Sequence, residues 1–322
     1  MDPASELEFN MPGFLRMYKN GRVERFQGNE TVPPSPAADP ANGGVASKDV
    51  VLDPATGISA RLFLPSVADA DPAKKKLPVV VFFHGGAFLV HSAASPLYHL
   101  YAASLAAAVP AVVVSVNYRL APESRIPGPY EDAFAAHRIS DFEDPEFRSS
   151  VLYDADVAPT PSPGSPHTAT PPASSSPGIA PAPTSRTTWP YGWGRTAAPM
   201  GTAARVKGKD PTWDFICDGK FGLDHPYINP MASPEVWRQL GSRRVLVITA
   251  EHCWFVDAAR AYAEDFLFIL LYLIYFHHKC GWEGELEFYE TKGEGHVFFL
   301  FKHGSDNALK EFAVVSDFVR RS

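Results

Sequence analysis

The sequence predicts one α/β domain built around a mostly parallel, doubly wound β-sheet. Three apolar runs rich in β-branched and aromatic residues have the composition of strands buried on both faces, and they lie at residues 77–83, 111–116 and 244–250. Each is followed by a stretch of helical character, at residues 98–108, 130–138 and 256–264. Strands that alternate with helices are typical of a parallel sheet covered on both faces.

Length and composition agree with a single large domain over residues 1–322. Of the 322 residues, 45% are hydrophobic, which is enough to form a substantial core. The formal net charge is −7 and no basic stripe stands out, so we expect no nucleic-acid partner. The three cysteines Cys217, Cys253 and Cys280 form no CxxC pair and no metal-ligand spacing. We therefore predict no metal site and no cofactor.

The cellular location is predicted from the first ten residues, the longest apolar run and the number of cysteines. The first ten residues carry three acidic side chains and no apolar run, unlike a secretory signal. An apolar insertion at residues 265–278 contains an uncharged run of 11 residues at 266–276, whereas a membrane-spanning helix needs about 20. A small, odd number of cysteines fits a reducing compartment. These features predict a cytoplasmic protein without a membrane span.

Residues 1–48 are predicted to form an N-terminal cap and linker. Apolar stretches within residues 7–18 suggest a short helix, and residues 20–26 resemble a hairpin. A Pro/Ala-rich linker follows at residues 31–44. The main sheet then begins with two short strands around a turn, at residues 50–52 and 58–64.

A proline-rich segment at residues 159–204 interrupts the alternating pattern. Between Pro159 and Pro190 there are 10 prolines and 12 serines or threonines in 32 residues, and no acidic residue. Prolines this dense exclude a central strand or a helix interior, and the composition predicts disorder. Beyond it, residues 285–290 are predicted as a strand and residues 308–320 as an amphipathic helix.

Two glycines directly after a buried strand are the first candidates for chemistry. His84, Gly85 and Gly86 follow the run that ends at Phe83. Without a Cβ atom, such glycines let backbone N–H groups approach a ligand oxygen closely. Donors placed in this way form the oxyanion hole that stabilises developing negative charge in acyl transfer. The alternative is an ordinary glycine-rich turn.

Three motifs in a fixed order carry a family resemblance. The segment HGGAF at residues 84–88 is followed by YRLAPE at 118–123 and by GEGHVF at 293–298. In this order the chain resembles the plant carboxylesterase family, the hormone-sensitive-lipase-like branch of the α/β-hydrolases, which is related to gibberellin receptors and 2-hydroxyisoflavanone dehydratases. The resemblance covers roughly residues 1–136 and 210–322. It implies an α/β-hydrolase fold and the hydrolysis of small apolar esters.

The resemblance also implies roles for individual residues. Gly85 and Gly86 would form the oxyanion hole, and His296 would be the general base that takes the proton of a serine nucleophile. The position of the catalytic acid is occupied by Cys253, and a thiol is a poor substitute for a carboxylate. Glu251 and Asp257 are nearby acidic alternatives, and neither is favoured over the other. A nucleophilic Cys253 is conceivable but stands at the acid position.

Three further motif residues are expected to be structural. His84 belongs to the glycine loop itself. Arg119 and Glu123 are expected to form an ion pair that braces the turn beneath that loop.

The nucleophile that this family requires is absent. No Gly-x-Ser-x-Gly pentapeptide occurs anywhere in the 322 residues, although the family places its serine there, on a sharp strand-to-helix turn. Bases that encode residues 173–188 can, when read one position earlier, spell a buried strand followed by Gly-Asp-Ser-Ala-Gly. We therefore hypothesise that residues 159–204 are translated out of frame and that residues 265–278 derive from intron read-through. The nucleotide sequence across codons 140–210 tests this hypothesis.

Three functions remain open at this point. The first is a carboxylesterase-type hydrolase that is impaired because it lacks the serine and has Cys253 at the acid position. The second is a non-catalytic binder of a hormone-like ligand, as in the gibberellin receptors, although His296 argues for an esterase ancestor. The third is a product without function from a faulty gene model. The sequence indicates neither the ester preference nor the oligomeric state.

Overall fold

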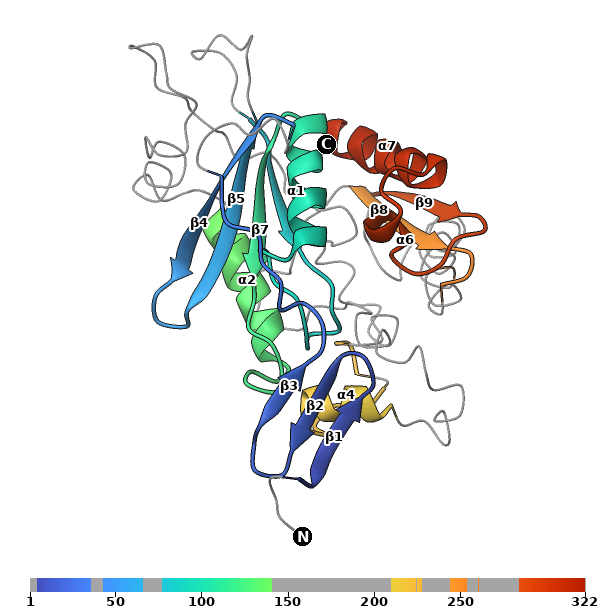
Figure 1. Ribbon diagram of the computed structural model, residues 1–322. Coiled ribbons are helices and arrows are strands. Elements are labelled where there is room, and N and C mark those ends of the chain that lie inside the picture. The colour runs from blue at the N-terminus through green and yellow to red at the C-terminus, as the bar shows by residue number, and fades with distance from the viewer. Residues whose placement is uncertain are drawn as a thin grey trace, which may run out of the picture.

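The computed structural model describes residues 5–35, 43–65, 77–140, 210–223, 225–227, 244–253, 260 and 284–321. Within these residues the strands form three sheets, with the orders β1-β2-β3, β4-β5-β7-β6 and β8-β9 (Figure 1). The proline-rich segment 159–204 and the insertion 265–278 lie outside the described residues, as does the predicted helix at 256–264 apart from residue 260.

The four-stranded sheet contains the predicted strands of the first half of the chain. Its members are β4 (Val45–Asp53), β5 (Ile58–Pro65), β6 (Val79–Phe83) and β7 (Val112–Asn117). The β6 and β7 strands pair in parallel, whereas β4 with β5 and β5 with β7 pair antiparallel. The strands predicted from apolar runs are confirmed, and β4 begins earlier than the sequence indicated.

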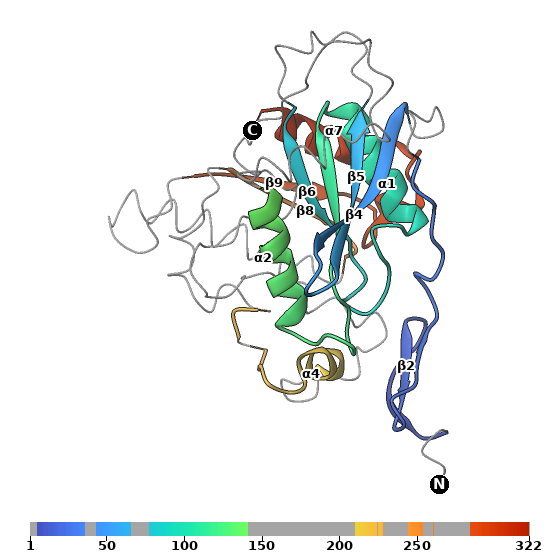
Figure 2. The ribbon, with the colours of Figure 1, turned by 90° about the vertical axis from the view of Figure 1, so that its left-hand side faces the viewer.

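Helices cover both faces of this sheet, which explains why β6 is apolar at every position and β7 at all positions but Ser115 and Asn117. Val79 and Val81 face the cluster that contains residues of α2 (Gly128–Ser140), whereas Val80 faces the cluster around α1 (Pro96–Ala108). Figure 2 shows α1 and α2 on opposite sides of the strands. Burial on both faces removes the polar positions that a half-exposed strand would show.

The C-terminal part of the chain forms a second parallel pair. The β8 strand (Arg244–Ala250) pairs in register with β9 (Glu285–Thr291), and α6 (Phe298–Phe301) and α7 (Asp306–Arg320) follow. Residues of β8 and α7 share a core cluster with β6, so the two sheets pack on common side chains. Among the described strands, β6 pairs with β7 alone and β8 with β9 alone.

The N-terminal helix predicted within residues 7–18 is wrong. The segment instead forms a three-stranded antiparallel sheet of β1 (Leu7–Met11), β2 (Leu15–Tyr18) and β3 (Val23–Arg25). The reason is local: Pro12 and Gly13 would stand inside that helix, and Gly13 adopts a positive φ of 79°. These two residues make the first turn of the meander instead.

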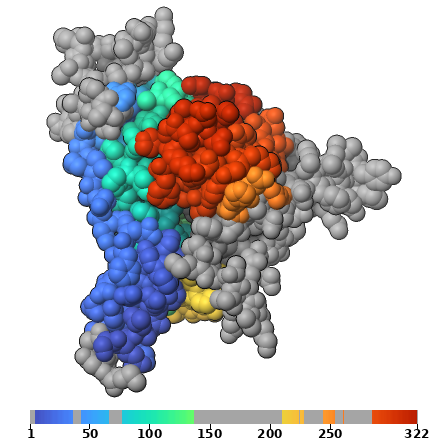
Figure 3. Space-filling view, turned by 45° about the vertical axis from the view of Figure 1, so that its right-hand side comes forward, coloured from blue at the N-terminus to red at the C-terminus, as the bar shows by residue number. Residues whose placement is uncertain are grey.

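The N-terminal sheet packs on a short helix from the second half of the chain. The ring of Phe9 in β1 stacks on Phe215 of α4 (Pro211–Cys217), with 3.8 Å between ring centroids. Figure 3 shows this blue segment and the yellow α4 side by side. The α4 helix is well defined locally, because the Asp210 carboxylate caps it by accepting hydrogen bonds from the N–H groups of Thr212 and Trp213.

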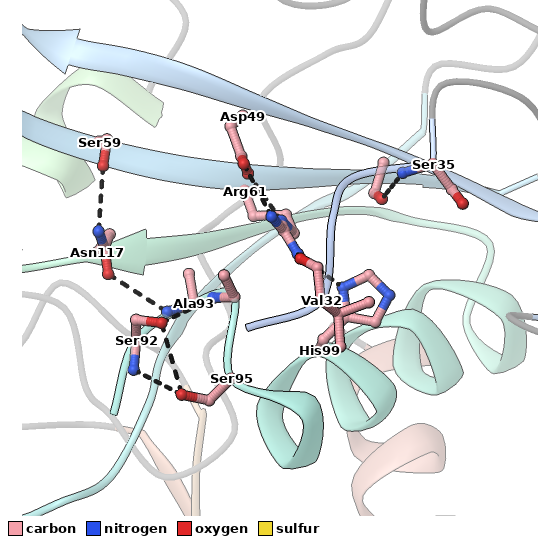
Figure 4. Close-up of polar contacts among 12 residues, drawn as sticks. Val32, Ser35, Asp49, Ser59, Arg61, Ser92, Ala93, Ser95, His99 and Asn117 are labelled. Atoms are coloured by element: carbon pink, nitrogen blue, oxygen red, sulfur yellow. Dashed lines mark hydrogen bonds and ion pairs between the residues drawn. The ribbon is translucent and has the colours of Figure 1, made fainter. Parts of the chain in front are cut away.

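A buried arginine ties the segment after the N-terminal sheet to the main sheet. Arg61 of β5 is 2% exposed and donates to both carboxylate oxygens of Asp49, at 2.7 and 2.8 Å. It also donates to the carbonyl of Val32 and lies 3.1 Å from His99 Nδ1 on α1 (Figure 4). The guanidinium group is thus paired and hydrogen-bonded, as a buried charge must be.

Among the described residues, no helix is long and apolar enough to cross a membrane.

Candidate active site

The glycine loop leaves β6 in a compact turn that only glycine fits. The carbonyl of Gly86 accepts hydrogen bonds from the N–H groups of Leu89 and Val90, at 2.9 and 3.1 Å. Gly86 has a φ of 122°, and a Cβ atom placed there would lie 2.2 Å from the carbonyl oxygen of Val90. The two residues that follow, Ala87 and Phe88, also have positive φ values, of 56° and 64°. The loop therefore stores backbone strain, which is typical of functional sites.

The part of this loop around Ala93 is held by the last residue of β7. The side-chain oxygen of Asn117, at the end of β7, accepts from the N–H of Ala93 at 3.3 Å, and its amide nitrogen donates to Ser59 of β5 (Figure 4). Ser92 donates its N–H to the hydroxyl of Ser95, which stands just before α1. Together these bonds join the loop to two strands and a helix.

His84 supports the loop from inside the core. It is 1% exposed, its ring stacks on Tyr118 at 4.4 Å, and the Tyr118 hydroxyl donates to its carbonyl oxygen at 2.7 Å. Burial lowers the pKa of His84 to about 4, so the ring is neutral at physiological pH. This environment suits the structural role predicted for His84.

The predicted ion pair between Arg119 and Glu123 does not form. Arg119 donates instead to Asp132 of α2, at 2.6 Å from Nη2 to Oδ1, and its backbone N–H binds the same carboxylate at 2.9 Å. Asp132 is 1% exposed and requires a cationic partner, whereas Glu123 points to the surface. Each residue thus has a partner other than the one predicted, Asp132 for Arg119 and Arg25 for Glu123.

Glu123 pairs with Arg25 of β3, a residue that sequence reasoning missed. The guanidinium of Arg25 donates to both oxygens of Glu123, at 2.9 and 2.6 Å. It also donates to the carbonyls of Leu89 and Ala121, at 2.7 and 2.9 Å. One side chain of the N-terminal sheet thus holds the glycine loop and the following motif together. Hydrogen bonding to Arg25 lowers the pKa of Glu123.

Cys253 and His296 are brought together by the parallel pair β8 and β9. Beyond the strands, the N–H of Glu251 donates to the carbonyl of Thr291, and the N–H of His252 donates to that of Glu294, each at 2.9 Å. These bonds hold the two loops side by side and place Cys253 Sγ 3.2 Å from His296 Nδ1. Cys253, which stands at the position predicted for the catalytic acid, therefore lies within hydrogen-bond distance of the imidazole.

The acidic alternatives do not replace this thiol in the described part of the chain. The Glu251 carboxylate accepts from the N–H of Gly293 at 2.9 Å and braces the loop that carries His296. Asp257 lies outside the described residues.

Burial lowers the pKa of His296 to about 4, so its imidazole is neutral at physiological pH. The described residues contain no cluster of three or more metal-ligating side chains.

His84 and His296 together predict an acid-sensitive fold, because the pKa of each is lowered on folding. A histidine whose pKa falls from about 6.5 to about 4 on folding takes up its proton first in the unfolded chain. The stabilisation is therefore complete above pH 6.5 and is lost as the pH falls toward 4. Each histidine should lower the free energy of unfolding by about 2 kcal/mol between pH 7.5 and pH 5.

One carboxyl group opposes this trend, so the test compares two proteins. Burial raises the pKa of Glu311 to about 7, which adds stability as the pH falls through that range. Urea unfolding at pH 7.5 and pH 5 should therefore be measured for the native chain and for His84→Asn. The variant should lose about 2 kcal/mol less on acidification than the native chain. Equal losses would show that His84 titrates normally.

Comparison with known proteins agrees with this fold. A family model of the alpha/beta hydrolase fold matches residues 80–147. Tuliposide A-converting enzyme b2, amyloplastic, of Tulipa gesneriana is 34% identical over 98% of this chain and 80% of its own length. Probable carboxylesterase 7 of Arabidopsis thaliana is 33% identical over 98% of this chain and 99% of its own length.

Solved structures show the same fold at lower identity. EstE1, a thermostable carboxylesterase cloned from a metagenomic library, superposes with a TM-score of 0.51 at 21% identity over 90% of each chain. An esterase from Pyrobaculum calidifontis has a TM-score of 0.51 at 20% identity, over 85% of this chain and 84% of its own. With relatives of one third identity along almost its whole length, the chain belongs to the plant carboxylesterase family of α/β-hydrolases.

Proposed function

We propose that this chain binds small apolar esters at a carboxylesterase-type site but hydrolyses them poorly. The contact between Cys253 Sγ and His296 Nδ1, at 3.2 Å, carries the proposal. This contact supports a site in which His296 is retained as the base and the thiol of Cys253 stands at the position of the catalytic acid. The tight loop at Gly85 and Gly86 supports binding of the ester carbonyl by backbone N–H groups.

Hydrolysis by this scaffold needs a serine nucleophile, a histidine base and an acid. In this chain the serine is missing and a thiol stands at the position of the acid. A serine must attack the acyl carbon while His296 takes its proton, and an acid must stabilise the resulting imidazolium. No Gly-x-Ser-x-Gly segment exists in the chain to present that serine. Loss of the nucleophile alone lowers kcat by about 10⁶-fold, and loss of the acid by about 10⁴-fold, in serine hydrolases where each was removed. Binding of the carbonyl oxygen does not depend on either group.

The test compares the native chain with His296→Gln, which keeps a polar side chain but no base. Both proteins should hydrolyse p-nitrophenyl acetate at rates that agree within about twofold, because neither uses a serine–histidine pair. Neither should be labelled by a fluorophosphonate probe. Labelling of a serine in the native chain, lost in His296→Gln, would overturn the proposal and reveal a working nucleophile.

The hormone-receptor alternative has less support. His296 keeps its place beside β9 and Cys253, whereas the resemblance implies that the receptors have lost this histidine. Saturable binding of a gibberellin to the purified chain, in equilibrium dialysis, would favour the receptor function instead.

The cytoplasmic location stays a prediction. The names of several tulip relatives describe chloroplastic or amyloplastic enzymes. Imaging of the full chain fused at its C-terminus to a fluorescent protein should show cytosolic signal, and plastid signal would contradict it.

A further inference from the structure

Glu311 is a buried carboxyl at the point where α7 meets α1 and the end of β9 (Figure 1). It is 5% exposed, and its Oε2 atom accepts a hydrogen bond from the hydroxyl of Thr291, the last residue of β9, which is 3% exposed. From α1, the ring of Tyr101 contacts those of Phe299 and Phe312, with 5.2 and 5.8 Å between ring centroids. Burial and the charge of Glu311 raise the pKa of Tyr101. The carboxyl thus lies in largely apolar surroundings, with a hydroxyl as its hydrogen-bond donor.

Two other carboxyl groups are buried in the described part of the chain, and each of them has a cationic partner. Asp132 is 1% exposed and pairs with Arg119, and Glu294 is 8% exposed and pairs with Lys302. Glu311 takes part in no ion pair of the described residues, and the charge of Glu294 repels a negative charge at this position. A buried carboxylate without a cation is costly, so the surroundings of Glu311 favour its neutral form.

Thr291 connects this carboxyl to the two loops of the candidate active site. The carbonyl of Thr291 accepts a hydrogen bond from the N–H of Glu251, at 2.9 Å, in the loop that leads to Cys253. The residues that follow Thr291 form the His296 loop, which we define as residues 292–296. A displacement of Thr291 therefore moves both loops.

We propose that Glu311 is a proton switch at the joint of α7, the end of β9 and the His296 loop: with its carboxyl neutral the joint is closed, and on ionisation it opens. A neutral carboxyl is satisfied by the hydroxyl of Thr291, whereas a carboxylate in the same place has one donor and no cation in the described contacts. Solvation of that charge requires α7 to move away from β9 and to admit water. The switch goes beyond the proposed function and does not depend on ester binding.

The direction of the pH dependence follows from two pKa values of the same carboxyl. Burial raises the pKa of Glu311 to about 7 in the closed joint, whereas the ordinary value of an exposed glutamate is 4.5. Between these values the open joint releases its proton first, so each rise of one pH unit makes opening about tenfold more favourable. Above pH 7 the closed joint is ionised as well, and the effect levels off.

The other titratable groups at the joint behave differently from Glu311. Burial keeps Tyr101 neutral by raising its pKa, and the hydrogen bond from Lys302 keeps Glu294 ionised by lowering its pKa. Burial lowers the pKa of His296 to about 4, so this histidine favours opening as the pH falls and opposes the effect of Glu311. The test must therefore compare two proteins that share His296 and differ at residue 311.

Hydrogen exchange of the full chain measures the opening of the joint at pH 5.5 and pH 7.5. The opening constant of each amide is obtained after correction for its intrinsic exchange rate. Glu311→Gln keeps an acceptor for the Thr291 hydroxyl but cannot ionise. For amides of α7 and the His296 loop, the ratio of opening constants at pH 7.5 and pH 5.5 should be about twentyfold larger in the native chain than in this variant.

Two controls restrict the effect to the joint. Asp317→Asn removes a carboxylate of the same helix that is 65% exposed, and it should leave the ratio within about twofold of the native value. Amides of β1, β2 and β3, at the other end of the molecule from α7 in Figure 1, should give the same ratio in the native chain and in Glu311→Gln. Equal ratios in α7 for these two proteins, or a difference that extends to β1, β2 and β3, would overturn the proposal.

A titration of the native chain decides the question if Glu311→Gln does not fold. The side-chain carboxyl carbon of Glu311 is assigned and followed by ¹³C NMR between pH 4 and pH 9. A midpoint near pH 7, with faster exchange of α7 amides in the ionised form, is the expected result. A midpoint near pH 4.5 would show that the carboxyl is solvated in the folded chain and would refute the switch.

Discussion

Gly86→Ala is expected to lower the free energy of unfolding by about 3 kcal/mol and to abolish binding of ester carbonyls. The added Cβ would lie 2.2 Å from the carbonyl oxygen of Val90, a backbone atom that accommodates it only if the loop shifts. The φ of 122° adds strain, since a side chain rarely adopts this conformation. The midpoint of urea unfolding measures the first effect, and equilibrium dialysis with p-nitrophenyl acetate analogues measures the second.

Gly57→Ala is the matched control for this loop. Gly57 has a positive φ of 78° as well, but no heavy atom lies within 4 Å of the added Cβ. Its substitution should cost about 1 kcal/mol, the cost of the backbone conformation alone. The difference between the two variants isolates the close approach at Gly86. Equal midpoints for Gly86→Ala and Gly57→Ala would show that the glycine loop is not tightly packed.

The strands of the core were predictable because their apolar patterns are continuous. At β6 and β7 the valines and phenylalanines face core clusters on both sides of the sheet, so β-branched residues occupy both faces. The motifs at residues 84–88 and 118–123 could be located because each follows such a strand directly. A sequence pattern shows where a buried strand ends, and a motif that directly follows the strand therefore lies at that edge of the sheet.

The partners of charged side chains were less predictable. Arg119 lies four residues from Glu123 in the chain, but its partner is Asp132, on the buried side of α2. Arg25 bridges to Glu123 across 98 positions, and no local pattern indicates that pairing. Ion pairs form between residues that the fold makes neighbours, so they become visible only with tertiary structure.

The pair Cys253 and His296 is the intermediate case. Neither residue type signals the other, but each follows a strand of a parallel pair, and parallel strands end at the same edge of a sheet. Strand ends and the family resemblance together therefore located the contact. What sequence could not supply was the engagement of Glu251 with Gly293, or the distance of 3.2 Å between Cys253 Sγ and His296 Nδ1.

Arg25→Met is expected to lower the free energy of unfolding by about 3 kcal/mol and to loosen the glycine loop. Methionine keeps the apolar stem but removes four donated hydrogen bonds. The carbonyls of Leu89 and Ala121 then lose donors in a partly buried setting, which costs about 1 kcal/mol or more for each. The pair with Glu123 is more exposed and contributes less. Urea unfolding measures the loss.

Arg22→Met is the matched control from the same hairpin. Arg22 pairs with Glu24 and lies over the ring of Tyr18, both at the surface, so its loss should cost less than about 1 kcal/mol. Hydrogen exchange provides the second readout: amides of residues 87–91 should exchange faster in Arg25→Met and stay unchanged in Arg22→Met. Because Arg25 alone joins β3 to the carbonyls of both motif loops in the described contacts, faster exchange confined to the N-terminal sheet would show that it stabilises the hairpin and not the loop.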